Sequence, residues 1–339
     1  MVDQVHLYKR QFGEINTRFW NLHFNRPAKT SKSILQEHNV LFLSTLDENG
    51  CLRWGEVAPL THLSKEKVLD CPTWITRWWN EEVAFEALPS SVKFGLECLL
   101  HPMDESEIAY RPMLINGLVW MNEIDAMYDE AKNKLASGFD CIKIKVGALN
   151  FDSECALLQR LRNEFGFDFT LRLDANGAWT LDEAKRKLES LAVFQVHSIE
   201  QPIAPGQWEK MSELVKISSI PIALDEELID IKVPDRLQML KAIQPHFLII
   251  KPTLHGGFAS ADNWIQMAQE LGIQWWATSA LESNIGLANI YQWLLQYETK
   301  LPQGLGTGSL YANNWMSPLE VTGQMIQWNV GKEWRAPWI

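Results

Sequence analysis

From about residue 112 onward, short apolar runs alternate with longer stretches in which apolar residues recur at helical spacing. We predict a strand at each run, over 141–147, 169–174, 196–200, 220–224, 247–250 and 273–277. Helical spacing is clearest over 124–135, and Gly138 is placed to end that helix. Strands that alternate with helices in this way indicate parallel βαβ units, and seven or eight units favour a closed (β/α) barrel over an open sheet.

The first hundred residues follow a different pattern. Residues 5–8 and 40–43 are rich in strand-forming residues, and Asn49-Gly50 precedes a return strand near 53–59, which predicts a hairpin. Residues 80–102 show helical spacing in two pieces, because Pro89 interrupts the pattern. We therefore expect an α+β domain over residues 1–105, the barrel over 106–315 and a separate C-terminal segment over 316–339.

Composition and charge limit the class of protein. The 339 residues are 46% hydrophobic and carry a formal net charge of −11, which argues against nucleic acid or an anionic membrane as a partner. No run of 18 apolar residues predicts a membrane span, and the charged N-terminus does not resemble a signal peptide. Five scattered cysteines without a C-x-x-C pair fit a reducing compartment. We expect a cytoplasmic globular enzyme, whose oligomeric state the sequence leaves open.

Charged residues stand on the predicted strands or at their ends, in an evenly spaced order. They are Lys143, Lys145, Asp174, Glu200, Asp225 and Lys251. Active sites of such barrels assemble at the carboxyl ends of the strands. Three carboxylates suit Mg²⁺, and lysines on opposite sides of the barrel mouth suit acid–base work. A single aspartate after a strand is more often a helix cap, and a K-x-K pair is usually a solvated edge; the joint pattern favours a site.

The motifs around these residues resemble a known family. They are Lys143-Ile-Lys145, Asp174-Ala-Asn176, Glu200-Gln-Pro202, Leu224-Asp225-Glu226 and Lys251-Pro-Thr253, together with Trp54-Gly-Glu56 and Leu114-Ile-Asn116-Gly117 outside them. Over nearly its whole length the chain resembles the enolase superfamily, in its muconate-lactonising-enzyme subgroup, and within it the o-succinylbenzoate synthase family. The resemblance implies a (β/α)7β modified TIM barrel with an α+β capping domain, against which the C-terminal segment packs.

The resemblance also implies roles for the charged residues. Asp174, Glu200 and Asp225 would bind Mg²⁺, with Mn²⁺ as the alternative. Lys145 would be the general base, with Lys143 beside it contacting the substrate carboxylate, and Lys251 would stabilise the anionic intermediate. The implied substrate is a small dianionic carboxylate, 2-succinyl-6-hydroxy-2,4-cyclohexadiene-1-carboxylate, which loses water to give 2-succinylbenzoate in menaquinone biosynthesis.

Further residues are candidate substrate contacts. Arg172 shares a strand face with Asp174 and lies near the site or forms an ordinary ion pair in the barrel. Asn176 belongs to the same motif as Asp174. Ser279 and Glu282 follow the seventh strand and either contact the succinyl arm or cap a helix. Gly306 lies in a glycine-rich turn that offers backbone N–H groups to a carboxylate or is simply flexible.

Residues 24–33 resemble the mobile loop that closes over substrate in this family, with surface charge as the plainer interpretation of its basic residues.

Alternatives within and outside the subgroup remain. N-acylamino acid racemase and muconate cycloisomerase would use the same catalytic set. A dipeptide epimerase would need acidic residues after the eighth strand, and residues 304–314 contain none. A binding or scaffold protein without activity is the alternative of a different class. The 16 tryptophans are assigned no catalytic role.

Overall fold

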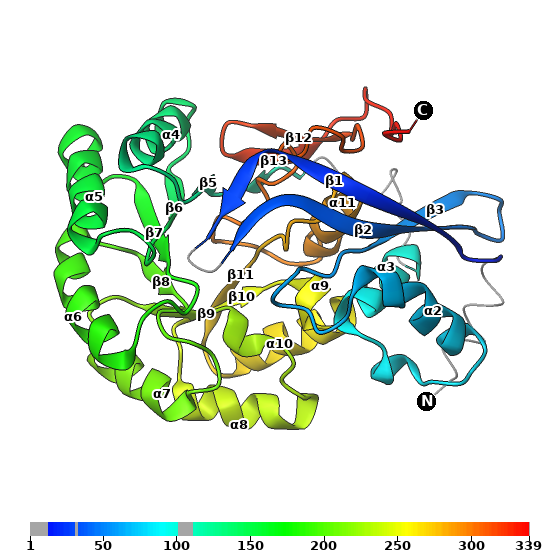
Figure 1. The fold of residues 1–339 in the computed structure, drawn as a ribbon, viewed down its shortest axis with the longest axis horizontal. Helices are drawn as coiled ribbons and strands as arrows, with labels where there is room; N and C mark the ends of the chain where they lie inside the picture. The colour runs from blue at the N-terminus through cyan, green and yellow to red at the C-terminus, as the bar shows by residue number, and fades with distance from the viewer. Residues whose placement is uncertain (1–12, 31–32, 101–110, 339) are drawn as a thin grey trace.

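A computed structural model describes residues 13–30, 33–100 and 111–338. Its larger part is a barrel of seven hydrogen-bonded parallel strands in sequential order, with helices on the outside (Figure 1). The strands are β5 (Gly117–Val119), β6 (Cys141–Lys145), β7 (Thr170–Asp174), β8 (Ser198–Glu200), β9 (Ile222–Leu224), β10 (Phe247–Ile250) and β11 (Gln274–Ala277). The helices between and after them are α4 (Ile124–Ala136), α5 (Phe151–Phe165), α6 (Leu181–Leu191), α7 (Trp208–Ile217), α8 (Val233–Ile243), α9 (Pro252–His255), α10 (Phe258–Glu270) and α11 (Asn284–Leu294).

The segment that follows α11 closes the ring. Gln303 forms a parallel bridge with Ile115, just before β5, and Gly304 forms one with Thr278, just after β11. This short eighth strand completes the (β/α)7β barrel that we predict. Strands β6 to β10 are buried on both faces, which explains why they stand out in the sequence as apolar runs.

The capping domain is an antiparallel sheet packed on two helices. Its strands are β1 (Asn16–Lys29), β2 (Ile34–Leu46) and β3 (Leu52–Val57), and its helices are α2 (Cys71–Trp79) and α3 (Ser90–Leu100). Leu41, Leu43 and Val57 of the sheet form one core with Trp78 and Leu96 of the helices. In Figure 1 the sheet, in blue, lies over the end of the barrel where the catalytic candidates are found.

The C-terminal residues contact both parts of the chain. The hairpin β12 (Leu319–Thr322) and β13 (Met325–Trp328) pairs with β4 (Met113–Leu114) at the start of the barrel. Beyond it, Trp338 contacts the rings of Trp20, Phe42 and Trp54 in the capping sheet. Several of the tryptophans thus form the aromatic core that joins this segment to the capping domain.

Several expectations for the first hundred residues are wrong or incomplete. The first helical piece is a single 3-10 turn, η2 (Phe85–Ala87), whereas α3 begins after Pro89 as expected. Helix α2 is not predicted, although the residues that it buries, Cys71, Ile75 and Trp78, recur at helical spacing. Phe24–Lys29 belong to strand β1 and not to a loop.

Two expectations cannot be compared with the structure. The strand expected over residues 5–8 and the domain border at 105/106 lie outside the described residues.

Short 3-10 turns are also present at η1 (Val68–Asp70), η3 (Ala192–Phe194) and η4 (Glu226–Leu228). Among the helices that the structure describes, none combines the length and the apolar character needed to cross a bilayer.

Candidate active site

Three carboxylates meet at the ends of three neighbouring strands. Asp174 and Glu200 are the last residues of β7 and β8 and lie opposite each other in the register, and Asp225 directly follows β9. Each of these residues is at most 1% exposed. Because parallel strands place their carboxyl ends at one edge, the order of motifs along the chain becomes a cluster in space.

Three lysines neutralise these carboxylates. The Nζ atom of Lys143 lies 2.8 Å from Glu200 Oε2 and 3.0 Å from Asp174 Oδ2. Lys145 Nζ donates to Asp174 Oδ2 at 2.6 Å, and Lys251 forms an ion pair with Asp225 from the other side of the barrel. All six side chains are nearly or fully buried, so the structure brings together the complete set that the sequence singles out.

The pairing decides how these groups titrate. Burial raises the pKa of Glu200 to about 8, and the neighbouring Asp174 adds to the shift. Burial acts on Asp174 in the same direction, but Lys143 and Lys145 outweigh it and hold the pKa of that carboxyl well below its usual range. Burial opposes the charged forms of Lys143 and Lys251, yet the facing carboxylates outweigh it and raise the pKa of both lysines.

The donor set fits a hard divalent cation. Among the described residues, no group of three or more histidine, cysteine or acidic side chains is arranged to hold a metal ion. In the cluster, the lysine ammonium groups form ion pairs with the oxygens of Asp174 and Asp225. One oxygen, Asp225 Oδ1, is nevertheless buried without any hydrogen-bond partner. An unpartnered buried carboxylate oxygen beside two further carboxylates suits an oxygen-preferring cation such as Mg²⁺.

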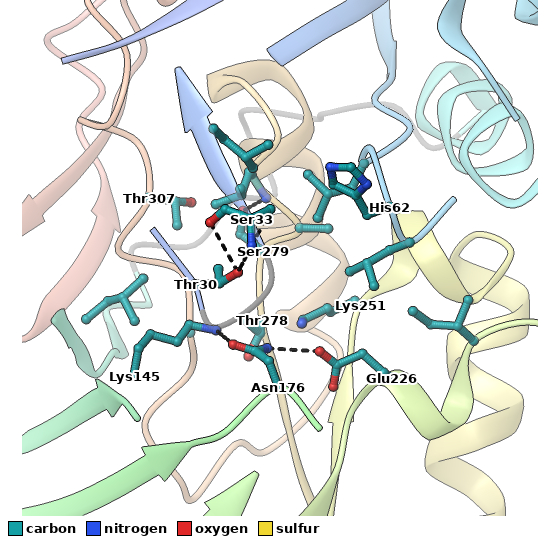
Figure 2. Close-up of a pocket in the computed structure, with 18 of the residues that line it drawn as sticks. Thr30, Ser33, His62, Lys145, Asn176, Glu226, Lys251, Thr278, Ser279 and Thr307 are labelled. Carbon is teal, nitrogen blue, oxygen red and sulfur yellow. Dashed lines mark hydrogen bonds between the residues drawn. The ribbon is translucent and has the colours of Figure 1, made fainter. Parts of the chain in front are cut away.

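A cavity of about 500 Å³ opens above this cluster, between the barrel and the capping domain. Figure 2 shows Lys145 and Lys251 reaching into it from opposite sides. Asn176 lies between them; it accepts a hydrogen bond from Lys145 Nζ at 2.9 Å and donates one to Glu226 Oε1 at 2.9 Å. The cavity thus has a charged floor on the barrel side.

The remaining walls of the cavity are mainly apolar. They include side chains from both domains, namely Leu35, Leu60, Leu63, Leu118, Trp120, Ile229 and Leu281. Small polar groups from Thr30, Ser33, Thr278 and Thr307 lie between them. His62, Glu227 and Asp230 also line the cavity. A mainly apolar cavity with lysines at its floor suits a ligand that carries a carboxylate on an apolar body.

The weaker candidates from the sequence divide into two groups. Asn176, Ser279 and Gly306 line the cavity. Glu282, in the loop between β11 and α11, does not line the cavity. It is fully buried and accepts hydrogen bonds from the hydroxyls of Ser279 and Thr253 and from the N–H of Ala280. Arg172 also lies outside the lining; it is buried over the ring of Trp276 and donates to the carbonyl of Pro302 at 2.8 Å.

Other residues of the site are not singled out by the sequence pattern. Glu226 lines the cavity and has one buried oxygen, Oε2, without a partner. The sequence names Glu226 only as part of the motif Leu224-Asp225-Glu226, without a role of its own. His255 is buried and its Nδ1 accepts a hydrogen bond from the backbone N–H of Lys251 at 3.2 Å, which fixes the backbone of that lysine. No sequence pattern reports a contact of this kind.

Two buried glutamates join the capping domain to the barrel. Glu56 on β3 accepts hydrogen bonds from the N–H and hydroxyl of Ser283 at 2.8 and 2.6 Å and from the N–H of Gly286 at 2.8 Å. Glu97 on α3 accepts one from the N–H of Phe258. Each carboxylate therefore satisfies backbone donors in the first turn of a barrel helix, α11 or α10.

Two family models match the chain. The model described as enolase C-terminal domain-like matches residues 126–326, and the model described as MenC, N-terminal domain, matches residues 24–103. The two regions correspond to the barrel and the capping domain of the structure.

Individual proteins match as well. An o-succinylbenzoate synthase of Desulfotalea psychrophila is 49% identical over 213 residues, which cover 62% of this chain and 58% of that protein. The crystal structure of MenC from the same organism aligns with a TM-score of 0.79 and 34% identity, over 94% of this chain and 99% of that one. A dipeptide epimerase from Enterococcus faecalis, solved with Mg and the dipeptide L-Leu-L-Tyr, shares the fold with a TM-score of 0.85 at 18% identity, over 94% of this chain and 97% of that one.

Proposed function

Because this chain belongs to the enolase superfamily, we propose that it dehydrates 2-succinyl-6-hydroxy-2,4-cyclohexadiene-1-carboxylate to 2-succinylbenzoate. The observation that carries this proposal is the pair of lysines, Lys145 and Lys251, on opposite sides of a cavity, with the lining lysines paired to the buried carboxylates of Asp174, Glu200 and Asp225. The relatives named o-succinylbenzoate synthase and MenC support the choice of substrate. The reaction would belong to menaquinone biosynthesis in the cytoplasm.

A divalent cation, Mg²⁺ in our proposal, would be held by Asp174, Glu200 and Asp225. Such a cation supplies electrostatic stabilisation to the negative charge that develops on the substrate carboxylate when the adjacent C–H loses its proton. Within the cluster of six buried charged side chains, Lys143, Lys145 and Lys251 formally balance Asp174, Glu200 and Asp225. A divalent cation would make this cluster formally positive, which suits a dianionic substrate despite the net charge of −11 on the whole chain.

The lysines would carry out the proton chemistry. In its neutral form Lys145 removes the proton from the carbon that bears the carboxylate. Asn176 Oδ1 keeps its Nζ atom pointed into the cavity. Lys251, facing it, stabilises the anionic intermediate. The hydroxyl group then leaves the neighbouring carbon as water, with the abstracted proton balancing the hydroxide, and the ring becomes aromatic.

The decisive experiment is a spectrophotometric assay of ring aromatisation. We expect dehydration that is lost on chelation of divalent cations and restored by Mg²⁺, and that falls by at least about 10³-fold in Lys145→Ala. Lys216→Ala, which changes an exposed lysine of α7, is the matched control. Activity that survives either chelation or the Lys145 substitution would contradict the mechanism.

One further activity has a specific observation in its favour. Two lysines on opposite sides of a carbon centre also suit removal and return of a proton, as in N-acylamino acid racemisation. A dipeptide epimerase is disfavoured, because residues 304–314 offer no carboxylate for a substrate ammonium group. If the purified protein exchanges the α-proton of N-acylamino acids much faster than it dehydrates, the assignment changes to racemase.

A further inference from the structure

Four non-glycine residues that line the cavity have a positive φ, namely His62, Asn176, Asp230 and Leu281, and Leu281 is the apolar one among them. Leu281, in the loop between β11 and α11, has a φ of 68°, in the left-handed region that a leucine rarely adopts. Its side chain lines the cavity and is only 8% exposed. Such a backbone conformation costs free energy and persists only where the surrounding residues enforce it.

Three hydrogen bonds hold the backbone of Leu281. Its carbonyl oxygen accepts one from the hydroxyl of Tyr311 at 2.6 Å and one from Nδ1 of His38 at 3.0 Å. Its N–H donates to the hydroxyl oxygen of Ser279 at 3.0 Å. Both polar groups of this one residue are therefore fixed by side chains, and the carbonyl uses both of its lone pairs.

One donor belongs to the capping sheet, and the other packs against it. His38 lies on β2 of the capping sheet, and burial lowers the pKa of its imidazole, which favours the neutral ring with a single N–H. Its Nδ1 atom lies 3.0 Å from Leu281 O and 3.3 Å from the hydroxyl oxygen of Tyr311, and its Nε2 atom lies 3.3 Å from Pro59 O; the tautomer protonated at Nδ1 donates to Leu281 O. Tyr311 packs its ring against Phe24 of β1 at 4.5 Å between centroids.

The held side chain is part of a continuous apolar surface. Leu281 packs with Leu60, Leu254 and Ala280, and Leu35 and Trp120 contact the same cluster. Leu60 and Leu35 belong to the capping domain, whereas Leu281 and Trp120 belong to the barrel. The position of Leu281 therefore determines how the two halves of the apolar wall meet in the cavity.

We propose that Leu281 is a specificity-determining residue, and that His38 and Tyr311 are positioning residues that act through it. By pinning its carbonyl oxygen they hold the apolar wall in the shape that packs against the uncharged part of the substrate. This inference rests on the proposed function for the identity of that substrate. The contribution is to binding, because none of the three residues contacts the lysines or carboxylates of the cavity floor in the described interactions.

The first test removes one hydroxyl. In Tyr311→Phe we expect KM for the dehydration substrate to rise about 3- to 10-fold while kcat stays within about twofold, since one hydrogen bond is lost. Tyr291→Phe is the matched control, because that hydroxyl is also donated to a backbone carbonyl, of Arg111 at 2.8 Å, far from the cavity lining. An unchanged KM in Tyr311→Phe, or an equal rise in the control, would overturn the proposal.

The second test asks whether Tyr311 acts through Leu281. Glycine adopts a positive φ without strain, so Leu281→Gly removes both the side chain and the need for support. We expect Leu281→Gly to raise KM by itself, and the added Tyr311→Phe change to have less than about a twofold effect in that background. If Tyr311→Phe retains its full effect there, its role does not pass through Leu281.

A conservative pair tests His38. Asparagine places an amide N–H near the position of Nδ1, whereas leucine has no donor. We expect His38→Asn to keep KM within about threefold of the original protein and His38→Leu to raise it as Tyr311→Phe does. Equal KM values in the two variants would refute the role of the donated hydrogen bond.

Failure of this inference can be separated from failure of the proposed function. If the unsubstituted protein does not dehydrate the substrate, the proposed function is wrong, and the same variants are measured by α-proton exchange of N-acylamino acids with the same expected KM changes. If dehydration proceeds and the KM values do not respond, only the inference about Leu281 is wrong. Thermal unfolding of each variant verifies that it is folded at the assay temperature.

Discussion

Replacing Glu56 by glutamine tests how the capping domain is attached to the barrel. Glu56 is fully buried and accepts three hydrogen bonds from Ser283 and Gly286 at the start of α11. Burial raises its pKa to about 7, although the hydrogen bonds from Ser283 oppose the shift. Glutamine has nearly the same shape but cannot ionise. Its NH2 group cannot accept the hydrogen bonds made to one of the two oxygens, and because that loss does not depend on pH, the pH dependence of the difference reports the titration of this one group.

The sign and size of the effect follow from the two pKa values. In the unfolded chain the carboxyl has its ordinary value of 4.5, so between pH 4.5 and about 7 the folded state binds more protons. The stabilising contribution of the protonated form is complete below pH 4.5 and is lost as the pH rises to about 7. One pKa unit corresponds to about 1.4 kcal/mol, which gives a change of about 2 to 3 kcal/mol between pH 5 and pH 8.

Urea unfolding at pH 5 and pH 8, followed by tryptophan fluorescence, measures this contribution. We expect the free energy of unfolding of the original protein, relative to Glu56→Gln, to fall by about 2 to 3 kcal/mol from pH 5 to pH 8. Glu298→Gln, which changes an exposed carboxylate, should show no such pH-dependent difference. If the difference for Glu56→Gln is the same at both pH values within about 0.5 kcal/mol, Glu56 titrates as it does in the unfolded chain and the reasoning is refuted.

Three further substitutions test the metal site and the packing of the fold. Asp225→Asn should weaken Mg²⁺ binding, measured by calorimetry, by more than about tenfold, because it removes one of three buried carboxylates; unchanged affinity would exclude Asp225 as a ligand. Gly55→Ala should lower the free energy of unfolding by about 3 kcal/mol, because its Cβ would lie 2.2 Å from the carbonyl oxygen of Gly95, whereas Gly13→Ala, with its nearest atom at 3.9 Å, should change little. Trp338→Ala should cost about 2 to 3 kcal/mol in urea unfolding, since the side chain contacts three aromatic rings of the capping sheet, and a cost near zero would show that the C-terminal segment does not stabilise that sheet.

The barrel was predictable because most of its strands, β6 to β10, are buried on both faces. Each run from β6 to β11 lies within or next to the range expected from the sequence, and β10 spans the same residues, 247–250. The eighth strand was not delimited in advance, because it consists of two bridging residues, Gln303 and Gly304, with no apolar run of their own. Helix α2 was missed because its apolar stripe consists of only three residues, Cys71, Ile75 and Trp78, in a helix of nine residues.

The catalytic candidates were predictable for a related reason. Residues such as Asp174 and Glu200 end strands, and parallel strands in a barrel end at the same edge, so their order along the chain already implies that they meet. The side chains that each of these residues contacts were not predictable from the sequence. Nothing in the spacing indicates that Lys143 bridges two carboxylates, that Glu282 is turned away from the cavity, or that His255 supports Lys251.

By itself, the sequence determined the order of the barrel elements and the six charged groups at the strand ends, because both follow from the local pattern of hydrophobic and polar residues along the chain. Only the tertiary structure decided how the domains meet. Glu56 and Ser283 are 227 positions apart and His38 and Leu281 are 243 apart, yet each pair is joined by a buried hydrogen bond. Such contacts depend on where two independently formed surfaces come together, and no local pattern of hydrophobic and polar residues records that position.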